Sequence, residues 1–159
     1  DLLRANKLSI DSIKTNMVAP YNLPEDKEKE LLEWYSNLIA MMHTEGVTES
    51  GHLQINKNIL IPLSELHKGL IYSSKVPFYN AAYYKALPFI VEFRNKSNGQ
   101  EKPELENCFD ALYGVWMLRL QRKEVSRETA GAVADIVKFV GLLSDYYAKE
   151  RIGELDLED

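Results

Sequence analysis

Apolar side chains recur every three or four residues along most of this 159-residue chain, a pattern typical of helices that bury one face. The clearest case is the stretch 103–123, whose main apolar positions fall within about 120° of one another on a helical wheel. These positions are Leu105, Cys108, Phe109, Leu112, Val115, Trp116 and Leu120. Further low-polarity residues extend around the rest of this helix. We therefore expect other helices to cover it on several sides, and the fold to pack around it and the last helix.

The same spacing predicts further helices at about 9–18, 24–46, 50–72, 78–96 and 126–151. Ser9 and Ser126 are suited to cap two of them, because a hydroxyl accepts from a free N–H of the first turn. Pro62 and Pro88 lie inside two others. Proline lacks an N–H and crowds the preceding turn, so we expect these two helices to be kinked or broken. The fold prediction is an all-α, bundle-like domain of five or six helices.

A single helical domain is expected over residues 1–152, because the length suits one core and no domain-sized linker interrupts the chain. Residues 153–159 form a strongly acidic tail. The chain begins without Met on residues 1–6, which are typical of the last turns of a helix. We therefore expect the N-terminal helix to be truncated.

The net charge and the cysteine content limit the binding partners and the cellular compartment that are expected. The net charge of −5 argues against binding to nucleic acid or to an anionic membrane. No run of about 18 apolar residues occurs, so no segment is expected to span a bilayer. The single cysteine excludes an internal disulfide and a Cys-based zinc site, and it favours a reducing compartment. A cytoplasmic location is therefore expected, with Cys108 acting as a small hydrophobe.

No sequence motif in the chain indicates a particular catalytic or metal-binding site. A metal site in a helical bundle needs two Glu-x-x-His motifs, and only Glu49-x-x-His52 occurs. The histidines are therefore interpreted as surface or capping residues, and no metal is expected. There is no G-x-S-x-G elbow, and the glycines are too dispersed for a phosphate-binding loop. We expect no cofactor and assign no catalytic residue, which favours a protein that is not an enzyme.

Tyrosines supply the weak candidates for a ligand site. Aromatic residues at helical spacing are more often core than pocket. Still, Tyr84 lies beside a backbone carbonyl that Pro88 would release, and it could line a polar-rimmed cleft. The residues considered for that cleft are Tyr83, Tyr84, Lys85, Arg119 and Asp145.

Arg119 is a charge within the apolar stripe of the 103–123 helix. One interpretation is that its stem packs on the core while the guanidinium reaches water near the end of the helix. The alternative is a buried charge, which would need an acidic partner such as Asp145 or Glu92.

Four segments taken together resemble a known family. They are 51–58 (GHLQINKN), 77–89 (PFYNAAYYKALPF), 109–115 (FDALYGV) and 141–147 (GLLSDYY). They are similar to a domain-of-unknown-function family of uncharacterised proteins from gut-type Bacteroidetes bacteria, over nearly the whole chain. The resemblance implies a bacterial, cytoplasmic, all-helical domain. It implies no activity and no catalytic residues.

Two classes of function remain open on these grounds. The first is a non-enzymatic module that binds another protein or forms a homo-oligomer, because almost every helix carries apolar surface and no catalytic constellation is found. The second is a small-molecule-binding protein or enzyme with a cleft near the Tyr83 and Tyr84 helix.

Overall fold

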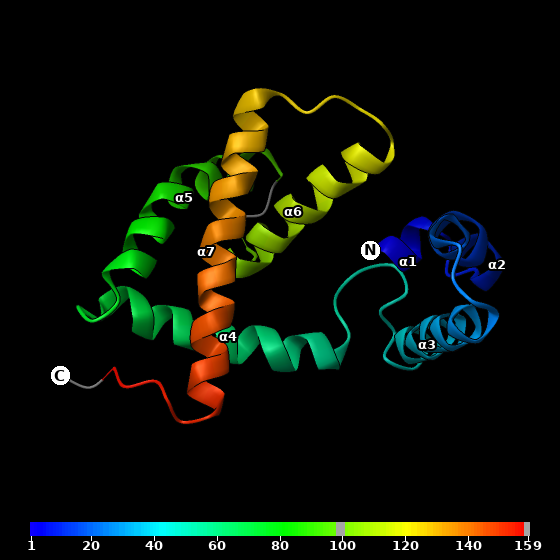
Figure 1. Cartoon of the computed structure of the whole chain (residues 1–159), viewed down its shortest axis with the longest axis horizontal. Helices are drawn as coiled ribbons and strands as arrows, with labels where there is room; N and C mark the ends of the chain where they lie inside the picture. The colour runs from blue at the N-terminus through cyan, green and yellow to red at the C-terminus, as the bar shows by residue number, and fades with distance from the viewer. Residues whose placement is uncertain (98–100, 158–159) are drawn as a thin grey trace. The chain divides into compact units, whose positions relative to one another are not determined.

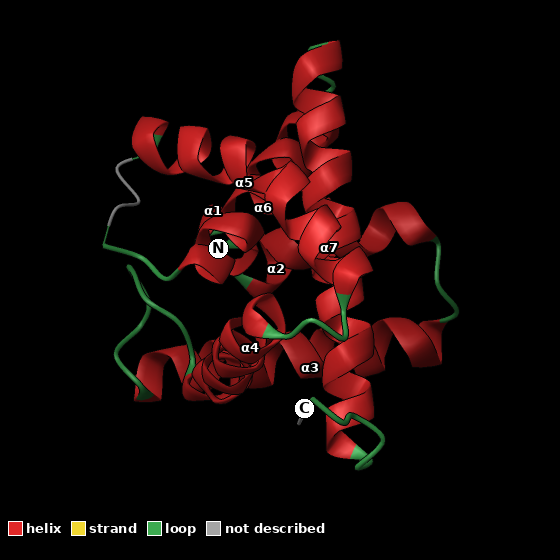
Figure 2. Cartoon of the chain, turned by 90° about the vertical axis from the view of Figure 1, so that its left-hand side faces the viewer, coloured by secondary structure: helices red, strands yellow, loops and turns green. Residues whose placement is uncertain are grey.

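The computed structural model describes residues 1–97 and 101–157, and within them it contains helices and no strand (Figure 2). The predicted all-α class is confirmed, but the count of five or six helices is wrong. The described residues form seven α-helices, because residues 2–5, expected as the end of a truncated helix, form a short helix of their own. The helices are α1 (Leu2–Ala5), α2 (Ile10–Ile13), α3 (Glu25–Thr44), α4 (Gln54–Tyr72), α5 (Pro77–Lys96), α6 (Glu104–Leu120) and α7 (Arg127–Arg151).

The two internal prolines do not interrupt their helices, so the predicted kinks or breaks are wrong. Pro62 lies inside α4 and Pro88 inside α5, and each helix continues through its proline. A proline removes one backbone hydrogen bond, which leaves the carbonyl four residues earlier without its usual donor. Asn58 and Tyr84 hold those carbonyls, and both residues are exposed. Water can therefore satisfy the carbonyls while the opposite side of each helix stays packed.

The chain divides into two compact units, residues 1–58 and 59–159, and each is described by itself. The boundary falls inside α4. The single domain expected over residues 1–152 stays a prediction.

The first unit packs α3 against α2 and the π-helical turn Lys14–Val18, which a 3-10 turn, Ala19–Tyr21, follows. Ser9 caps α2 as predicted, since its hydroxyl accepts from the Ser12 N–H at 3.3 Å. Arg4 connects α1 to the loop after α3 by hydrogen bonds. Its guanidinium donates to the carbonyls of Val47 and Gly51, each at 2.6 Å, and to that of Thr48 at 3.1 Å.

The second unit is built from α5, α6 and α7, which pack against one another, together with the apolar face of α4 (Figure 1). Its centre is aromatic and aliphatic. Tyr79 and Phe139 are fully buried with ring centroids 5.6 Å apart, and Leu70, Ile90 and Leu143 surround them.

Helix α6 turns a different face to this core than the one expected. Its buried residues are Leu105, Asn107, Cys108, Ala111 and Val115. Phe109, Trp116 and Leu120, which the sequence placed in the core stripe, are exposed. The helix is apolar around more than half its circumference, so periodicity alone leaves its orientation open. Small residues face the core, which lets neighbouring helices approach closely.

The acidic tail from residue 153 onward contributes two leucines to the core of the second unit. Leu155 and Leu157 pack against the core of the second unit. A Cβ on Gly69 of α4 would lie 3.9 Å from the Leu157 side chain, so Leu157 rests directly over that glycine. Asp156 lies 3.7 Å from the Lys75 ammonium. Glu158 and Asp159 of the predicted tail lie outside the described residues.

Candidate functional site

A polar cluster lies inside the second unit, where α4, α5 and α6 meet. His67 of α4 is only 6% exposed, so the interpretation of the histidines as surface or capping residues is wrong for it. Its Nδ1 lies 2.6 Å from the Tyr79 hydroxyl, and its Nε2 lies 3.3 Å from a carboxylate oxygen of Glu104. An ionised carboxylate only accepts hydrogen bonds, so Nε2 donates to Glu104; in the tautomer with its proton on Nε2, Nδ1 accepts from the Tyr79 hydroxyl.

Glu104 is the shared partner in this cluster. It begins α6, and besides His67 it accepts from the Tyr83 hydroxyl and from Arg94 at 3.4 Å. The hydrogen bond from His67 is the main cause that holds the pKa of Glu104 below its usual value, and the Tyr83 and Arg94 partners add to it. Three side chains from α4 and α5 therefore converge on one ionised carboxylate of α6.

Burial keeps the neighbouring acids neutral. It raises the pKa of Tyr83 to about 12 and also raises that of Tyr79. Burial likewise raises the pKa of the Cys108 thiol to about 12, with the Glu104 charge as a second cause. A thiol in this state is a poor nucleophile. Because Tyr79 is fully buried and Tyr83 nearly so, the cluster joins helices rather than meeting a substrate.

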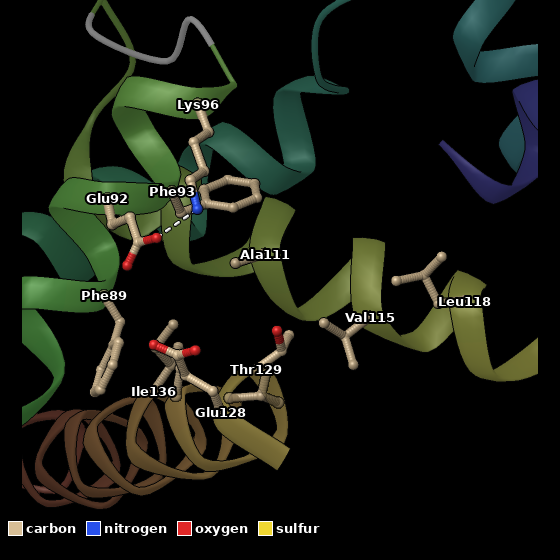
Figure 3. Close-up of a pocket in the computed structure, with 12 residues that line it drawn as sticks. Phe89, Glu92, Phe93, Lys96, Ala111, Val115, Leu118, Glu128, Thr129 and Ile136 are labelled. Atoms are coloured by element: carbon tan, nitrogen blue, oxygen red, sulfur yellow. Dashed lines mark hydrogen bonds and ion pairs between the residues drawn. The ribbon is translucent and has the colours of Figure 1, made fainter. Parts of the chain in front are cut away.

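A groove between α5, α6 and α7 is a second feature of this unit, with a volume of about 340 Å³. That volume lies within the range of small-molecule pockets. Figure 3 shows Phe89 of α5 and Ile136 of α7 facing the same space, with Ala111 and Val115 of α6 on its other side. The walls are therefore mostly apolar and come from three helices.

Charged side chains surround the groove. Glu92 and Lys96 form an ion pair one turn apart on α5 (Figure 3), and this pairing is the main cause that raises the pKa of Lys96. Glu128, in the first turn of α7, adds a weaker attraction to the same lysine. Two carboxylates and one ammonium give the groove a local charge of −1.

The outward face of α6 is the third feature. Phe109, Trp116 and Leu120 are 38, 42 and 56% exposed. Their spacing of seven and four residues places them within about 40° on the helical wheel. Tyr113, whose ring centroid is 6.3 Å from that of Trp116, lies on the same side. We call these four residues the α6 stripe.

The five sequence-predicted ligand residues do not form one cluster in the described part of the chain. Tyr83 is buried and contacts Tyr84, with ring centroids 5.2 Å apart, whereas Tyr84 is 60% exposed. Lys85 is exposed and paired with Asp135 at 2.7 Å. Arg119 and Asp145 are both exposed, so Arg119 is not the buried charge of the second interpretation. None of the five lines the groove. The cleft near Tyr83 and Tyr84 stays a prediction.

His67 and the residues that line the groove were not predicted as site residues, and they come from separate helices. His67 follows the apolar stripe of α4 at the same spacing as Leu63 and Leu70, which signalled its burial. The groove has no comparable signal, because Phe93, Val115 and Val133 belong to three helices whose mutual orientation the sequence does not state. Among residues 1–97 and 101–157, no group of three or more His, Cys, Asp or Glu side chains is arranged to hold a metal ion.

These features define a small all-helical protein with a polar cluster in its core, an apolar groove and an exposed aromatic stripe. The chain belongs to the family described as "Domain of unknown function (DUF4924)", whose model matches residues 1–154. The resemblance to a domain-of-unknown-function family is thereby confirmed. No curated protein and no solved structure matches the chain. Within the described residues, every helix is too short or too polar to cross a bilayer.

Proposed function

We propose that this chain is a self-associating helical module that pairs with a second copy of itself through the α6 stripe. The observation that carries the proposal is the exposure of Phe109, Trp116 and Leu120 along one helix face. Large aromatic side chains on a rigid helix supply much of the binding energy of protein interfaces. An enzymatic role is not part of this proposal.

The α6 stripe is compatible with a second copy because it carries no charge. The chain carries a net charge of −5, so two copies repel each other over most approaches. The α6 stripe itself is uncharged. A two-fold interface places the same patch on both subunits, and an uncharged apolar patch is compatible with itself.

The charges at the two ends of α6 favour an antiparallel pairing. Glu106 lies in its first turn, where Glu104 is already held in the core cluster, whereas Arg119, Arg122 and Lys123 lie at its last turn and just beyond. In residues 1–97 and 101–157, none of these three cations forms an ion pair. Antiparallel helices bring the acidic end of one copy beside the basic end of the other, and their macrodipoles also oppose.

The test replaces Trp116 by glutamate. Trp116→Glu places a charge at the middle of the stripe, and we expect the dimer dissociation constant to rise by about thirtyfold or more, corresponding to ~2 kcal/mol. Size-exclusion chromatography with light scattering over a concentration series measures the change.

Val137→Glu provides the matched control, because Val137 is also an exposed apolar residue, 53% exposed, but lies on α7. We expect this variant to associate like the unmodified chain. Circular dichroism establishes that both variants keep their helices. Equal association of all three proteins would contradict the role of the stripe.

We further propose a bacterial cytoplasm as the setting. This placement is supported by the single cysteine, which leaves the chain no internal disulfide, and by the burial of Cys108. Nucleic acid is not expected as a partner, because the chain is acidic overall.

A further inference from the structure

We propose that the groove between α5, α6 and α7 binds a small amphiphilic amine, with an apolar body in the groove and an ammonium group at its acidic rim. The site is separate from the α6 stripe. Ala111 and Val115 face the groove from the buried side of α6, whereas Trp116 and Leu120 lie on its exposed side.

The groove exists because small side chains form parts of its walls. Ala111 of α6 and Ala132 of α7 lie between bulkier residues, and they leave a volume of about 340 Å³ that the neighbours do not fill. Phe89, Phe93 and Ile136 provide much of the remaining apolar surface. Such walls favour a hydrocarbon or aromatic body, because its transfer from water is worth about 25 cal/mol per Å² buried.

The rim selects the charge of the ligand. Glu92 already pairs with Lys96, so its charge is largely compensated. Glu128 has no ion pair within the described residues and interacts with Lys96 only through the weaker Coulomb attraction. The remaining negative charge attracts an ammonium group and repels a carboxylate. The aromatic ring of Phe93 beside the groove adds a face on which a cation is stabilised.

The experiment compares two probes of the same shape and opposite charge, phenylbutylamine and phenylbutyrate, by calorimetric titration of the full chain. We expect the amine to bind and the carboxylate to bind at least about tenfold more weakly. Absence of amine binding, or binding of phenylbutyrate as strong as that of the amine, would overturn the proposal.

Two variants locate the binding. Glu128→Gln removes the uncompensated charge from an exposed position, and we expect amine affinity to fall about fivefold. Glu150→Gln, at the opposite end of α7, serves as the control and should leave affinity unchanged. Ala132→Leu fills the groove, and amine binding should be lost.

A urea titration establishes that Ala132→Leu folds; if it does not, Glu128→Gln decides the question alone. Amine binding that is equal in the unmodified chain and in every folded groove variant would mean adventitious binding only, and it would overturn the proposal.

Discussion

His67 connects three helices because its two ring nitrogens face different partners. One nitrogen meets the Tyr79 hydroxyl at 2.6 Å and the other meets Glu104 at 3.3 Å. Burial of such a ring without partners would cost about 1–3 kcal/mol, so the hydrogen bonds are a condition of its position. The cluster therefore fixes how α4, α5 and α6 meet rather than supplying a reactive group.

Removal of the Tyr79 hydroxyl tests this account of His67. Tyr79→Phe keeps the ring but leaves the buried Nδ1 of His67 without a donor, so we expect the free energy of unfolding to fall by about 1–2 kcal/mol. Urea denaturation measures the change. Tyr84→Phe is the matched control on the same helix, because Tyr84 is 60% exposed and its change should stay within about 0.5 kcal/mol. Similar effects for the two variants would contradict a structural role for the cluster.

The ionised state of Glu104 predicts a specific pH dependence. Its pKa is lowered in the folded chain from the ordinary value of 4.5, so the folded state favours the carboxylate. The associated stability is fully present above pH 4.5 and is lost as the pH falls through the lower, folded-state pKa.

Glu104→Gln should remove that part of the acid sensitivity. We therefore expect the stability difference between the unmodified chain and the variant to shrink as the pH falls below about 4.5, which urea midpoints at a series of pH values will measure. A difference that stays constant across the acidic range would contradict the lowered pKa.

Sequence reasoning at the residue scale succeeded where the chemistry is local. Ser126 caps α7 as predicted, and Arg119 reaches solvent as its first interpretation required. The burial of His67 was missed although the spacing of the α4 stripe indicated it. Its partners Tyr79 and Glu104 could not be named, because they lie on other helices.

At the scale of one element, the start of α7 offers a clean test. The Ser126 hydroxyl accepts from the Thr129 N–H at 3.1 Å. We expect Ser126→Ala to lower the free energy of unfolding by about 1 kcal/mol, since a first-turn N–H loses its partner. Ser144→Ala, at an exposed position inside the same helix, should be neutral or slightly stabilising. Thermal denaturation followed by circular dichroism compares the two, and equal effects would contradict the capping role.

Helix α6 shows why element existence is easier to predict than orientation. Its span was expected at 103–123 and is observed as Glu104–Leu120. Its apolar surface covers more than half the wheel, so spacing could not distinguish the buried Ala111 side from the exposed Trp116 side. The same ambiguity hid the groove, which depends on the small residues that face the core.

For the whole molecule, the helical class followed from periodicity, whereas the two compact units did not. No linker rich in glycine or proline separates them, because the boundary lies within α4. Residue spacing and composition described the chain correctly as helical. They could not identify the α6 stripe, because exposure depends on which helices cover which faces.

Self-association through that stripe is the central claim, and sedimentation equilibrium of the unmodified chain tests it most directly. Over about 1–100 μM, where weak interfaces assemble, we expect the mass to rise from monomer toward dimer. Opposite charges at the two ends of α6 contribute to the stability of the dimer. The dimer should therefore weaken at about 1 M salt, where charge–charge attraction is screened beyond ~3 Å. A clean monomer at every concentration and salt level would contradict the account.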